Sequence, residues 1–226
     1  MVILIELPLT NKLLRACLFD LDGVFIDSTH GWVIALQVIL EKEGYPIPSS
    51  SSIEKIVALS TESQLIQLFP KLEHENIKRK RLVHNIDDYF IQNIDSHVVL
   101  FPNSFKVLKH LKDTGLVLGL VTNNQRKVAL SVLRKFNLLD FFDNVTSLED
   151  MSKPKPHPSG LIHTLERLNS TKHNSVYIGD SPSDLKASSS TGIPFILIER
   201  PNTNFDFPKL GPEVLIIQDL LELISF

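Results

Sequence analysis

Residues 17–28 read CLFDLDGVFIDS, and this stretch indicates the fold. An apolar run ends at Phe19, two aspartates follow one residue apart, Asp20 and Asp22, and Gly23 stands directly behind them. A short apolar run that is bounded by a turn is typical of a strand buried on both faces. The two carboxylates are therefore expected at the end of a strand in the core.

Short apolar runs of the same kind recur further along the chain. They read LVLGLVTNN at 116–124, SVYIGD at 175–180 and PFILIER at 194–200. Helical patterns lie between them, for example SFKVLKHLKDTG, in which apolar residues return on one face and Gly115 marks the C-terminal end. Strands that alternate with helices predict an α/β fold, a Rossmann-like parallel sheet with right-handed crossovers and helices on both faces. In such sheets ligands bind at the carboxyl ends of the strands.

Residues 29–95 interrupt this alternation. Three amphipathic patterns follow one another without a strand between them, and they predict helices over 32–44, 52–69 and 75–94. LSTESQ at 59–64 would supply a further capping signal if a helix restarts there. We therefore expect an all-helical domain inserted after the first strand. The predicted division is a catalytic core of residues 1–27 and 96–226 and a helical domain of residues 28–95.

Composition restricts the possible partners. The chain has 226 residues with 23 basic and 26 acidic side chains and a net charge of -3, which argues against nucleic acid or an anionic membrane and favours a small soluble ligand. The single cysteine, Cys17, cannot form an internal disulfide and suits a reducing compartment. The opening MVILIELPLT is interrupted by Glu6 and Pro8 and lacks a basic n-region. We expect neither a targeting segment nor a membrane span, and a cytoplasmic protein.

Polar side chains end three of the predicted strands, because Asp20 closes the first and Thr122 and Asp180 close two of the others. The carboxyl ends of parallel strands share one edge of a sheet, so these side chains are expected to converge. Converging carboxylates repel each other unless a cation neutralises them, and oxygen ligands favour a hard ion such as Mg²⁺. One carboxylate can then attack an electrophilic phosphorus while the hydroxyl and backbone N–H groups hold the phosphoryl oxygens.

A lysine to balance the remaining negative charge has two candidates in MSKPKPHPSG, Lys153 and Lys155. Prolines stiffen this segment and a helix is predicted to start behind it, so a lysine here is held in place. These features alone do not decide between the two lysines.

Four motifs, FDLDGV with a following DS, VTNN, KPKPHP and GDSPSD, stand in an order and approximate spacing that resembles the haloacid dehalogenase superfamily. The inserted helices resemble its helical cap, and the closest likeness is to the phosphoglycolate phosphatase-like branch. The resemblance spans residues 15 to about 200. It implies a Mg²⁺-dependent phosphatase that hydrolyses a small phosphorylated metabolite, phosphoglycolate-like or a sugar phosphate, through an aspartyl-phosphate.

The resemblance also implies roles for the two aspartates of the first motif. Asp20 is expected to be the nucleophile and a Mg²⁺ ligand. Asp22 is expected to protonate the leaving oxygen, then to activate water, and to bind Mg²⁺ through its main-chain carbonyl. This acid and base role needs a carboxyl whose proton affinity responds to nearby charge.

The other motifs supply the remaining predicted site residues. Thr122 and the amide of Asn123 are expected to bind the phosphoryl group, and Asp180 to bind the metal. Asp184 is expected at or just behind the metal ligands. Lys153 is expected to stabilise the nucleophile and the transferred phosphate, because KPKP matches the family pattern Lys-Pro-x-Pro.

Each assignment has a plainer alternative, since an aspartate or threonine at a strand end often caps a helix or turn and a loop lysine is often solvated. Other functions also stay open: a phosphomutase of the β-phosphoglucomutase type, a non-catalytic phosphate-binding regulatory protein, and a pyrophosphatase or phosphonate-cleaving enzyme. The stretch IVALSTESQLIQLF at 56–69 lacks the glycine expected in the substrate-facing loop of the cap. The sequence therefore names no substrate, and it predicts a monomer or weak homodimer.

Overall fold

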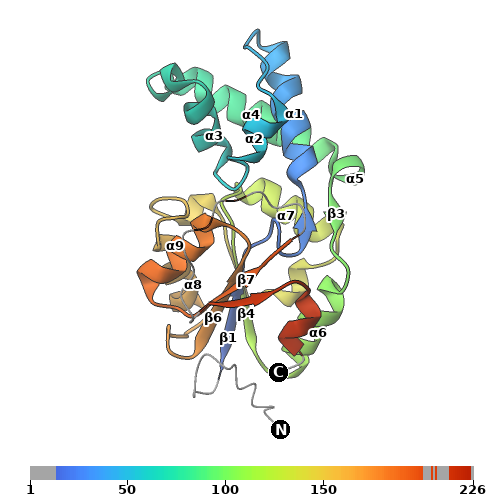
Figure 1. The fold of residues 1–226 in the computed structure, drawn as a ribbon, viewed down its shortest axis with the longest axis vertical. Helices are drawn as coiled ribbons and strands as arrows, with labels where there is room; N and C mark the ends of the chain where they lie inside the picture. The colour runs from blue at the N-terminus through green and yellow to red at the C-terminus, as the bar shows by residue number, and fades with distance from the viewer. Residues whose placement is uncertain (1–13, 201–204, 206, 208–213, 225–226) are drawn as a thin grey trace.

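The computed structural model describes residues 14–200, 205, 207 and 214–224, and the opening stretch 1–10 lies outside them. Six strands form one parallel sheet in the order β5-β4-β1-β6-β7-β8 (Figure 1). The strands are β1 Ala16–Phe19, β4 Val117–Val121, β5 Asn144–Thr146, β6 Ser175–Gly179, β7 Phe195–Ile198 and β8 Leu215–Ile217. The predicted parallel α/β fold is confirmed.

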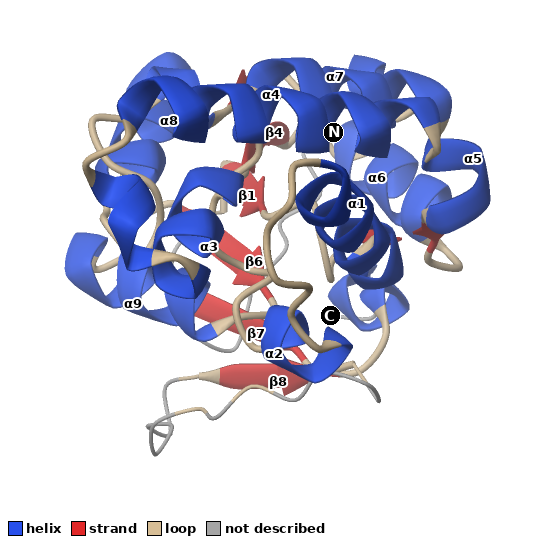
Figure 2. Ribbon diagram, turned by 90° about the horizontal axis from the view of Figure 1, so that it is seen from above, coloured by secondary structure: helices blue, strands red, loops and turns tan. Residues whose placement is uncertain are grey.

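Strand β1 lies between β4 and β6 and is buried throughout. Its residues alternate between two apolar cores, because Ala16 and Leu18 belong to one and Cys17 and Phe19 to the other. This period of two residues is what a strand buried on both faces requires. Helices α8 and α9 cover the face of Leu18, and α6 and α7 the face of Phe19 (Figure 2). The helices of the core are α6 Ser104–Asp113, α7 Arg126–Lys135, α8 Ser159–Arg167 and α9 Pro182–Thr191, with 3₁₀ turns η2 Leu139–Phe141, η3 Leu148–Asp150 and η4 Leu220–Ile224.

The inserted helices stand beyond the carboxyl ends of the sheet (Figure 1). They are α1 Thr29–Lys42, α2 Ser50–Glu54, α3 Thr61–Leu68, η1 Pro70–Glu73, α4 Asn76–Gln92 and α5 Ile94–His97. A short antiparallel ribbon of β2, Ile26–Asp27, and β3, Val99–Leu100, carries the chain into this helical part and back. We call the helical part the cap, and its boundaries at 28 and 95 stay a prediction. No helix in the described part of the chain is both long and apolar enough to span a membrane.

The prediction of one helix over 52–69 is wrong, because the chain leaves the helix after Glu54 and starts α3 at Thr61. Ser60 is the N-cap of α3, and its Oγ accepts a hydrogen bond from the Ser63 N–H at 3.3 Å. A serine in this position favours a new helix start over continuation of the old one. The break leaves residues 55–60 as a loop that faces the sheet.

Helix α4 of the cap contacts helix α7 of the core through charged groups. Lys127 Nζ donates to Asp88 Oδ1 at 2.8 Å and lies 3.9 Å from Asp87 Oδ2. Asp87 is fully buried, Thr61 Oγ1 donates to its Oδ1 at 3.1 Å, and its Oδ2 has no hydrogen bond. Burial raises the pKa of Asp87 to about 7, although Lys127 and Thr61 oppose the rise.

We expect Asp87→Asn to remove part of the pH dependence of stability. Because the pKa of Asp87 is about 7 in the folded protein against 3.8 as the ordinary value, the folded protein binds this proton more tightly. The tighter binding of this proton stabilises the folded protein fully below the ordinary pKa of 3.8, and the stabilisation is lost as the pH rises through the folded pKa of about 7. The free energy of unfolding of the wild type should therefore fall by about 2–4 kcal/mol. Urea unfolding between about pH 4.5 and pH 8 measures it. Parallel stability curves for wild type and variant would contradict the assignment, and exposed Asp113→Asn is the control.

Gly119 in β4 lets helix α8 approach the sheet. A Cβ at this position would lie 2.5 Å from Thr164 Cγ2 and 3.1 Å from Leu168 Cδ1. Because side chains in a packed core cannot move aside freely, we expect Gly119→Ala to lower the free energy of unfolding by about 1–3 kcal/mol. Adding Thr164→Ser removes the clashing methyl group and keeps the hydroxyl, so it should restore part of the loss in chemical denaturation. No recovery in the double variant would place the strain elsewhere.

Candidate active site

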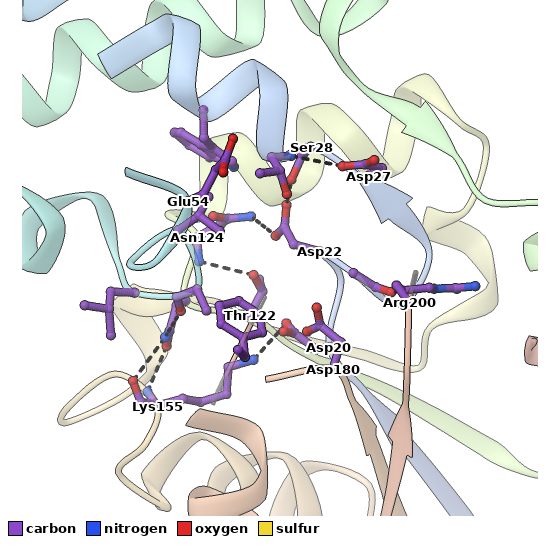
Figure 3. A pocket seen from close by; sticks show the side chains of 18 of the residues that line it. Asp20, Asp22, Asp27, Ser28, Glu54, Thr122, Asn124, Lys155, Asp180 and Arg200 are labelled. Atoms are coloured by element: carbon purple, nitrogen blue, oxygen red, sulfur yellow. Dashed lines mark hydrogen bonds and ion pairs between the residues drawn. The ribbon is translucent and has the colours of Figure 1, made fainter. Parts of the chain in front are cut away.

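Three strand ends meet at the upper edge of the sheet and bring together the side chains predicted there. Asp20 follows β1, Thr122 follows β4 and Asp180 follows β6, and all three line one pocket below the cap (Figure 3). Each is almost completely buried. The parallel register therefore places the residues of three separate motifs side by side.

Asp20 presents one fixed oxygen and one open oxygen. Its Oδ1 accepts the Leu21 N–H at 2.8 Å and lies 2.8 Å from Lys155 Nζ. Among the described residues no donor reaches Oδ2. Burial raises the pKa of Asp20 to about 8, Lys155 opposes this, and the nearby Asp184 and Asp22 add to it. The group therefore favours an additional positive charge beside it.

The structure places Lys155, and not Lys153, at the carboxylates. Lys155 is 2% exposed, and its Nζ lies 2.8 Å from both Asp20 Oδ1 and Asp184 Oδ1. The same ammonium donates to the main-chain carbonyl of Val121 at 3.0 Å. Burial disfavours its charge, but the two carboxylates outweigh this and raise its pKa.

Hydrogen bonds to the loop backbone explain why Lys155, and not Lys153, reaches the carboxylates. Asn123 Oδ1 accepts the Lys155 N–H at 2.8 Å, and Asn123 Nδ2 donates to the Lys155 carbonyl at 3.1 Å. The backbone of Lys153 is instead bonded to Ser159 Oγ, and its side chain is exposed. The sequence held a signal for this, because KPHP at 155–158 also matches Lys-Pro-x-Pro.

Asp184 is fully buried and has no acceptor capacity left. Its Oδ1 accepts Lys155 Nζ at 2.8 Å and the Tyr177 hydroxyl at 2.6 Å. Its Oδ2 accepts the N–H of Ser181 at 3.1 Å and the Oγ of Ser181 at 2.6 Å. A carboxylate offers about four lone-pair sites, and all four are used. Of the two positions expected from the sequence, at the metal or just behind its ligands, the geometry therefore favours the second, where Asp184 positions Lys155.

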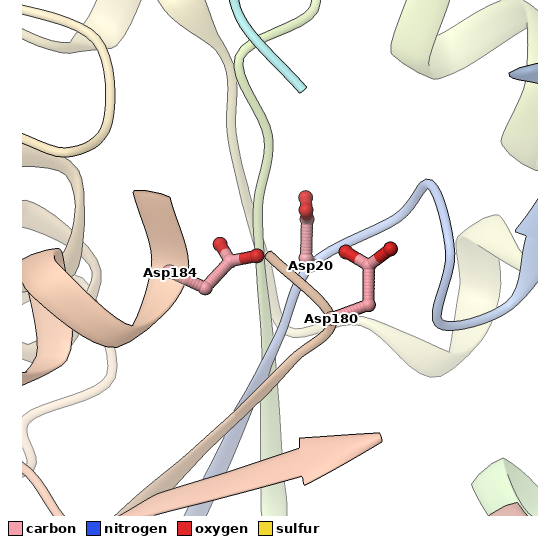
Figure 4. Close-up of side chains that lie close together, drawn as sticks. All are labelled: Asp20, Asp180 and Asp184. Carbon is pink, nitrogen blue, oxygen red and sulfur yellow. The ribbon is translucent and has the colours of Figure 1, made fainter. Parts of the chain in front are cut away.

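Asp180 is the carboxylate best placed to share a cation with Asp20 (Figure 4). Oxygen atoms of Asp20, Asp180 and Asp184 lie within 4.8 Å of one another. Burial and the two neighbouring carboxylates raise the pKa of Asp180 well above its ordinary value, and in the described part of the chain no hydrogen bond reaches its carboxylate. Two buried carboxylates, each with an oxygen that accepts no hydrogen bond from the described residues, fit a hard divalent ion such as Mg²⁺.

Gly23 provides the space for the Asp180 carboxylate. Its φ is +72°, and a Cβ at this position would overlap the Asp180 side chain. A glycine adopts this left-handed conformation at little cost. The chain can therefore turn away from the site and enter the ribbon that leads to the cap.

Asp22 is held by two donors on the cap side of Asp20 (Figure 3). The Ser28 hydroxyl donates to its Oδ1, and Asn124 Nδ2 donates to its Oδ2 at 2.7 Å. Burial raises its pKa while these hydrogen bonds oppose the rise. The Ser28 side chain makes no capping bond to α1, whereas Asp27 Oδ1 accepts the Thr29 N–H at the start of that helix.

Thr122 and Asn123 both lie at the site, with different surroundings. The Thr122 Oγ1 faces the pocket and accepts the Asn124 N–H at 3.2 Å. The Asn123 side chain also donates to the carbonyl of Ala58 in the cap at 3.1 Å. The sequence offered no sign of this link, because it joins residues far apart in the chain.

The cap completes the pocket wall. Trp32 is buried and stacks on Phe90 with ring centroids 3.9 Å apart, and it also lines the pocket. The other cap residues in this wall are Ser28, Thr29, Glu54, Val57, Ala58 and Leu59. Most come from α2 and the loop behind it, where the sequence had predicted an unbroken helix.

Comparisons with known proteins agree with this geometry. Residues 17–198 match the family model described as haloacid dehalogenase-like hydrolase. The chain is 28% identical over 215 residues to a candidate pyrophosphatase named PpaX from Caldanaerobacter subterraneus, covering 94% of each chain. It is 28% identical over 188 residues to phosphoglycolate phosphatase from Vibrio cholerae, covering 80% of this chain and 82% of that one. The crystal structure of β-phosphoglucomutase from Clostridium difficile has the same fold, with a TM-score of 0.77 at 21% identity and 93% coverage of both chains.

We expect Lys155→Met to lower the free energy of unfolding by about 3–5 kcal/mol, because it leaves Asp20 and Asp184 buried without their cation. Lys153→Met removes an exposed lysine from the same loop and should change stability by less than about 0.5 kcal/mol. Urea titration of both variants measures the difference. Equal losses would contradict the placement of Lys155.

Proposed function

Because the chain belongs to the haloacid dehalogenase-like hydrolase family, we propose that it is a Mg²⁺-dependent phosphatase acting on a small phosphorylated metabolite. The family predicted from four motifs is confirmed, and so is the prediction of a hydrolytic enzyme. One observation carries the proposed reaction. Asp20 has one oxygen fixed by Leu21 and Lys155 and the other open to the pocket.

In the first step Asp20 attacks the phosphorus of the substrate, and the oxygen of the leaving group departs. The leaving oxygen takes its proton from Asp22, whose pKa is raised by burial and which therefore carries a proton more readily than an exposed aspartate. The Thr122 hydroxyl and backbone N–H groups behind β4 hold phosphoryl oxygens. Lys155 stabilises the negative charge that Asp20 shares with the transferred phosphate.

In the second step Asp22 accepts a proton from water, which attacks the aspartyl-phosphate and frees Asp20 and inorganic phosphate. Ser28 and Asn124 fix the orientation of Asp22 for both proton transfers. The bond from Asn123 to Ala58 holds the cap loop over the site, which limits the access of bulk water.

Asp20, Asp180 and the main-chain carbonyl of Asp22 would hold Mg²⁺. The ion would neutralise the carboxylates and polarise the phosphoryl group. We assign Asp184 to the support of Lys155, since its four acceptor sites are occupied.

The names of the relatives support a small phosphorylated substrate, because they include a phosphoglycolate phosphatase and a candidate pyrophosphatase. A cytoplasmic location fits the single buried thiol of Cys17. This location and the monomeric or weakly dimeric state stay predictions.

We expect Asp20→Asn to abolish Mg²⁺-dependent phosphate release, because an amide is too weak a nucleophile to form the aspartyl-phosphate. The assay measures phosphate from a panel of sugar phosphates, nucleotides, phosphoglycolate, pyrophosphate and an aryl phosphate, with Mg²⁺ or with a chelator. Asp140→Asn, at an exposed position, is the matched control and should keep wild-type rates.

The folded variant should still show Mg²⁺-dependent thermal stabilisation, since Asp180 remains. Normal turnover by Asp20→Asn would exclude Asp20 as the nucleophile. A folded wild type that releases no phosphate from any compound would contradict the proposed function.

A further inference from the structure

The part of the pocket that receives the leaving group carries acidic side chains on the cap side. Glu54, at the end of α2, and Asp27, at the end of β2, line the same pocket as Asp20 and lie on the far side of Asp22 from it (Figure 3). Neither is needed by the phosphoryl-transfer steps. Both are exposed, so their carboxylates can meet a ligand that enters the pocket.

The described pocket wall contains two cations, Lys155 and Arg200, and each is engaged by the protein. Lys155 pairs with buried carboxylates. The Arg200 Nε donates to the Gly23 carbonyl at 3.0 Å and Nη2 to the Val24 carbonyl at 2.7 Å, and its guanidinium lies 3.8 Å from the centre of the Phe101 ring. Arg200 thus supports the loop behind Asp22, and its guanidinium also interacts electrostatically with Asp219, Asp180 and Asp27. Its charge therefore offsets part of that of Asp27, while the cap contributes no lysine or arginine among the described residues of this wall.

The uncharged cap residues of the wall are suited to a short carbon skeleton. Val57, Ala58 and Leu59 present a small apolar surface, and Trp32 adds an aromatic ring. An aromatic ring also attracts a cation at close range. A leaving group with a carboxylate or a second phosphate would face Glu54 and Asp27 across this space, with the repulsion that like charges exert.

We propose that Glu54, with Asp27, selects a phosphomonoester whose leaving group carries no second anion, and that an ammonium-bearing alcohol is preferred. The expected order is amino-alcohol phosphate, then uncharged-alcohol phosphate, then hydroxy-acid phosphate. This inference rests on the proposed phosphatase function and adds the class of its substrate. It separates this chain from relatives named for phosphoglycolate.

Three compounds of similar size test the order: phosphoethanolamine, 2-hydroxyethyl phosphate and phosphoglycolate. With Mg²⁺ present, we expect kcat/KM to fall by about five- to tenfold at each step of this series, as for charges interacting across a partly solvated pocket. An aryl phosphate is measured in parallel to show that the enzyme is active.

Variants at Glu54 separate the effect of charge from the intrinsic reactivity of the esters. We expect Glu54→Gln to reduce the ratio of kcat/KM for phosphoethanolamine over phosphoglycolate, and Glu54→Lys to reduce it by about tenfold or more. Glu166→Lys makes the same change of net charge at an exposed site on α8 and should leave the ratio unchanged.

Each outcome bears on one of the two proposals. Turnover of the aryl phosphate without a preference for the ammonium ester over the carboxylate ester overturns the inference and leaves the phosphatase function standing. A ratio that is the same in wild type and Glu54→Lys also overturns the role of Glu54. No phosphate from any compound overturns the proposed function instead.

Discussion

The buried ammonium of Lys155 is the interaction on which the site depends. It lies 2.8 Å from carboxylate oxygens of both Asp20 and Asp184, in a place from which water is excluded. Without a cation these carboxylates would repel one another in a medium of low dielectric constant. One cation does not balance the whole group, because three buried carboxylates converge here; burial first, and the neighbouring carboxylates in addition, raise the pKa values of Asp20 and Asp180. The same imbalance that requires Lys155 therefore also favours a divalent ion.

The positions of these groups follow from the parallel sheet. Strand β1 lies between β4 and β6, and all three are parallel, so the residues that follow their carboxyl ends meet at one edge of the sheet. Tyr177 of β6 and Ser181, which follows that strand, hold Asp184, and Asn123, which follows β4, holds the backbone of Lys155. The reacting groups are thus fixed by a rigid sheet and by hydrogen bonds to buried neighbours. Such fixed dipoles and charges need little reorganisation during a reaction.

In the proposed function the cap would select the substrate, because it can change without disturbing this edge. Its connection to the core is the narrow ribbon β2–β3, and its contacts over the site include the bond from Asn123 to Ala58 and the ion pair of Lys127 with Asp88. Helix α2 ends at Glu54, and the loop that follows it supplies the apolar part of the pocket wall beside the Glu54 carboxylate. Small changes in this loop would alter the leaving-group side of the pocket while Asp20 and its neighbours stay in place.

Several features could be predicted from the sequence because they depend on local pattern. Apolar runs ending in polar residues identified β1, β4 and β6, and they placed Asp20, Thr122 and Asp180 at one edge. The order of the four motifs identified the family for the same reason, since each motif is short and continuous.

Only the tertiary structure decided which lysine serves the site and which residues surround the leaving group. KPKPHP contains two overlapping matches to Lys-Pro-x-Pro, and the choice between Lys153 and Lys155 depends on a hydrogen-bonded side chain, Asn123, that comes from another strand end. The break between α2 and α3 has a local signal in the capping bond of Ser60, but the folded structure decides that the loop between these helices lines the pocket. Local propensity sets where strands end, but long-range contacts set where side chains point, because burial and hydrogen bonding are properties of the folded whole.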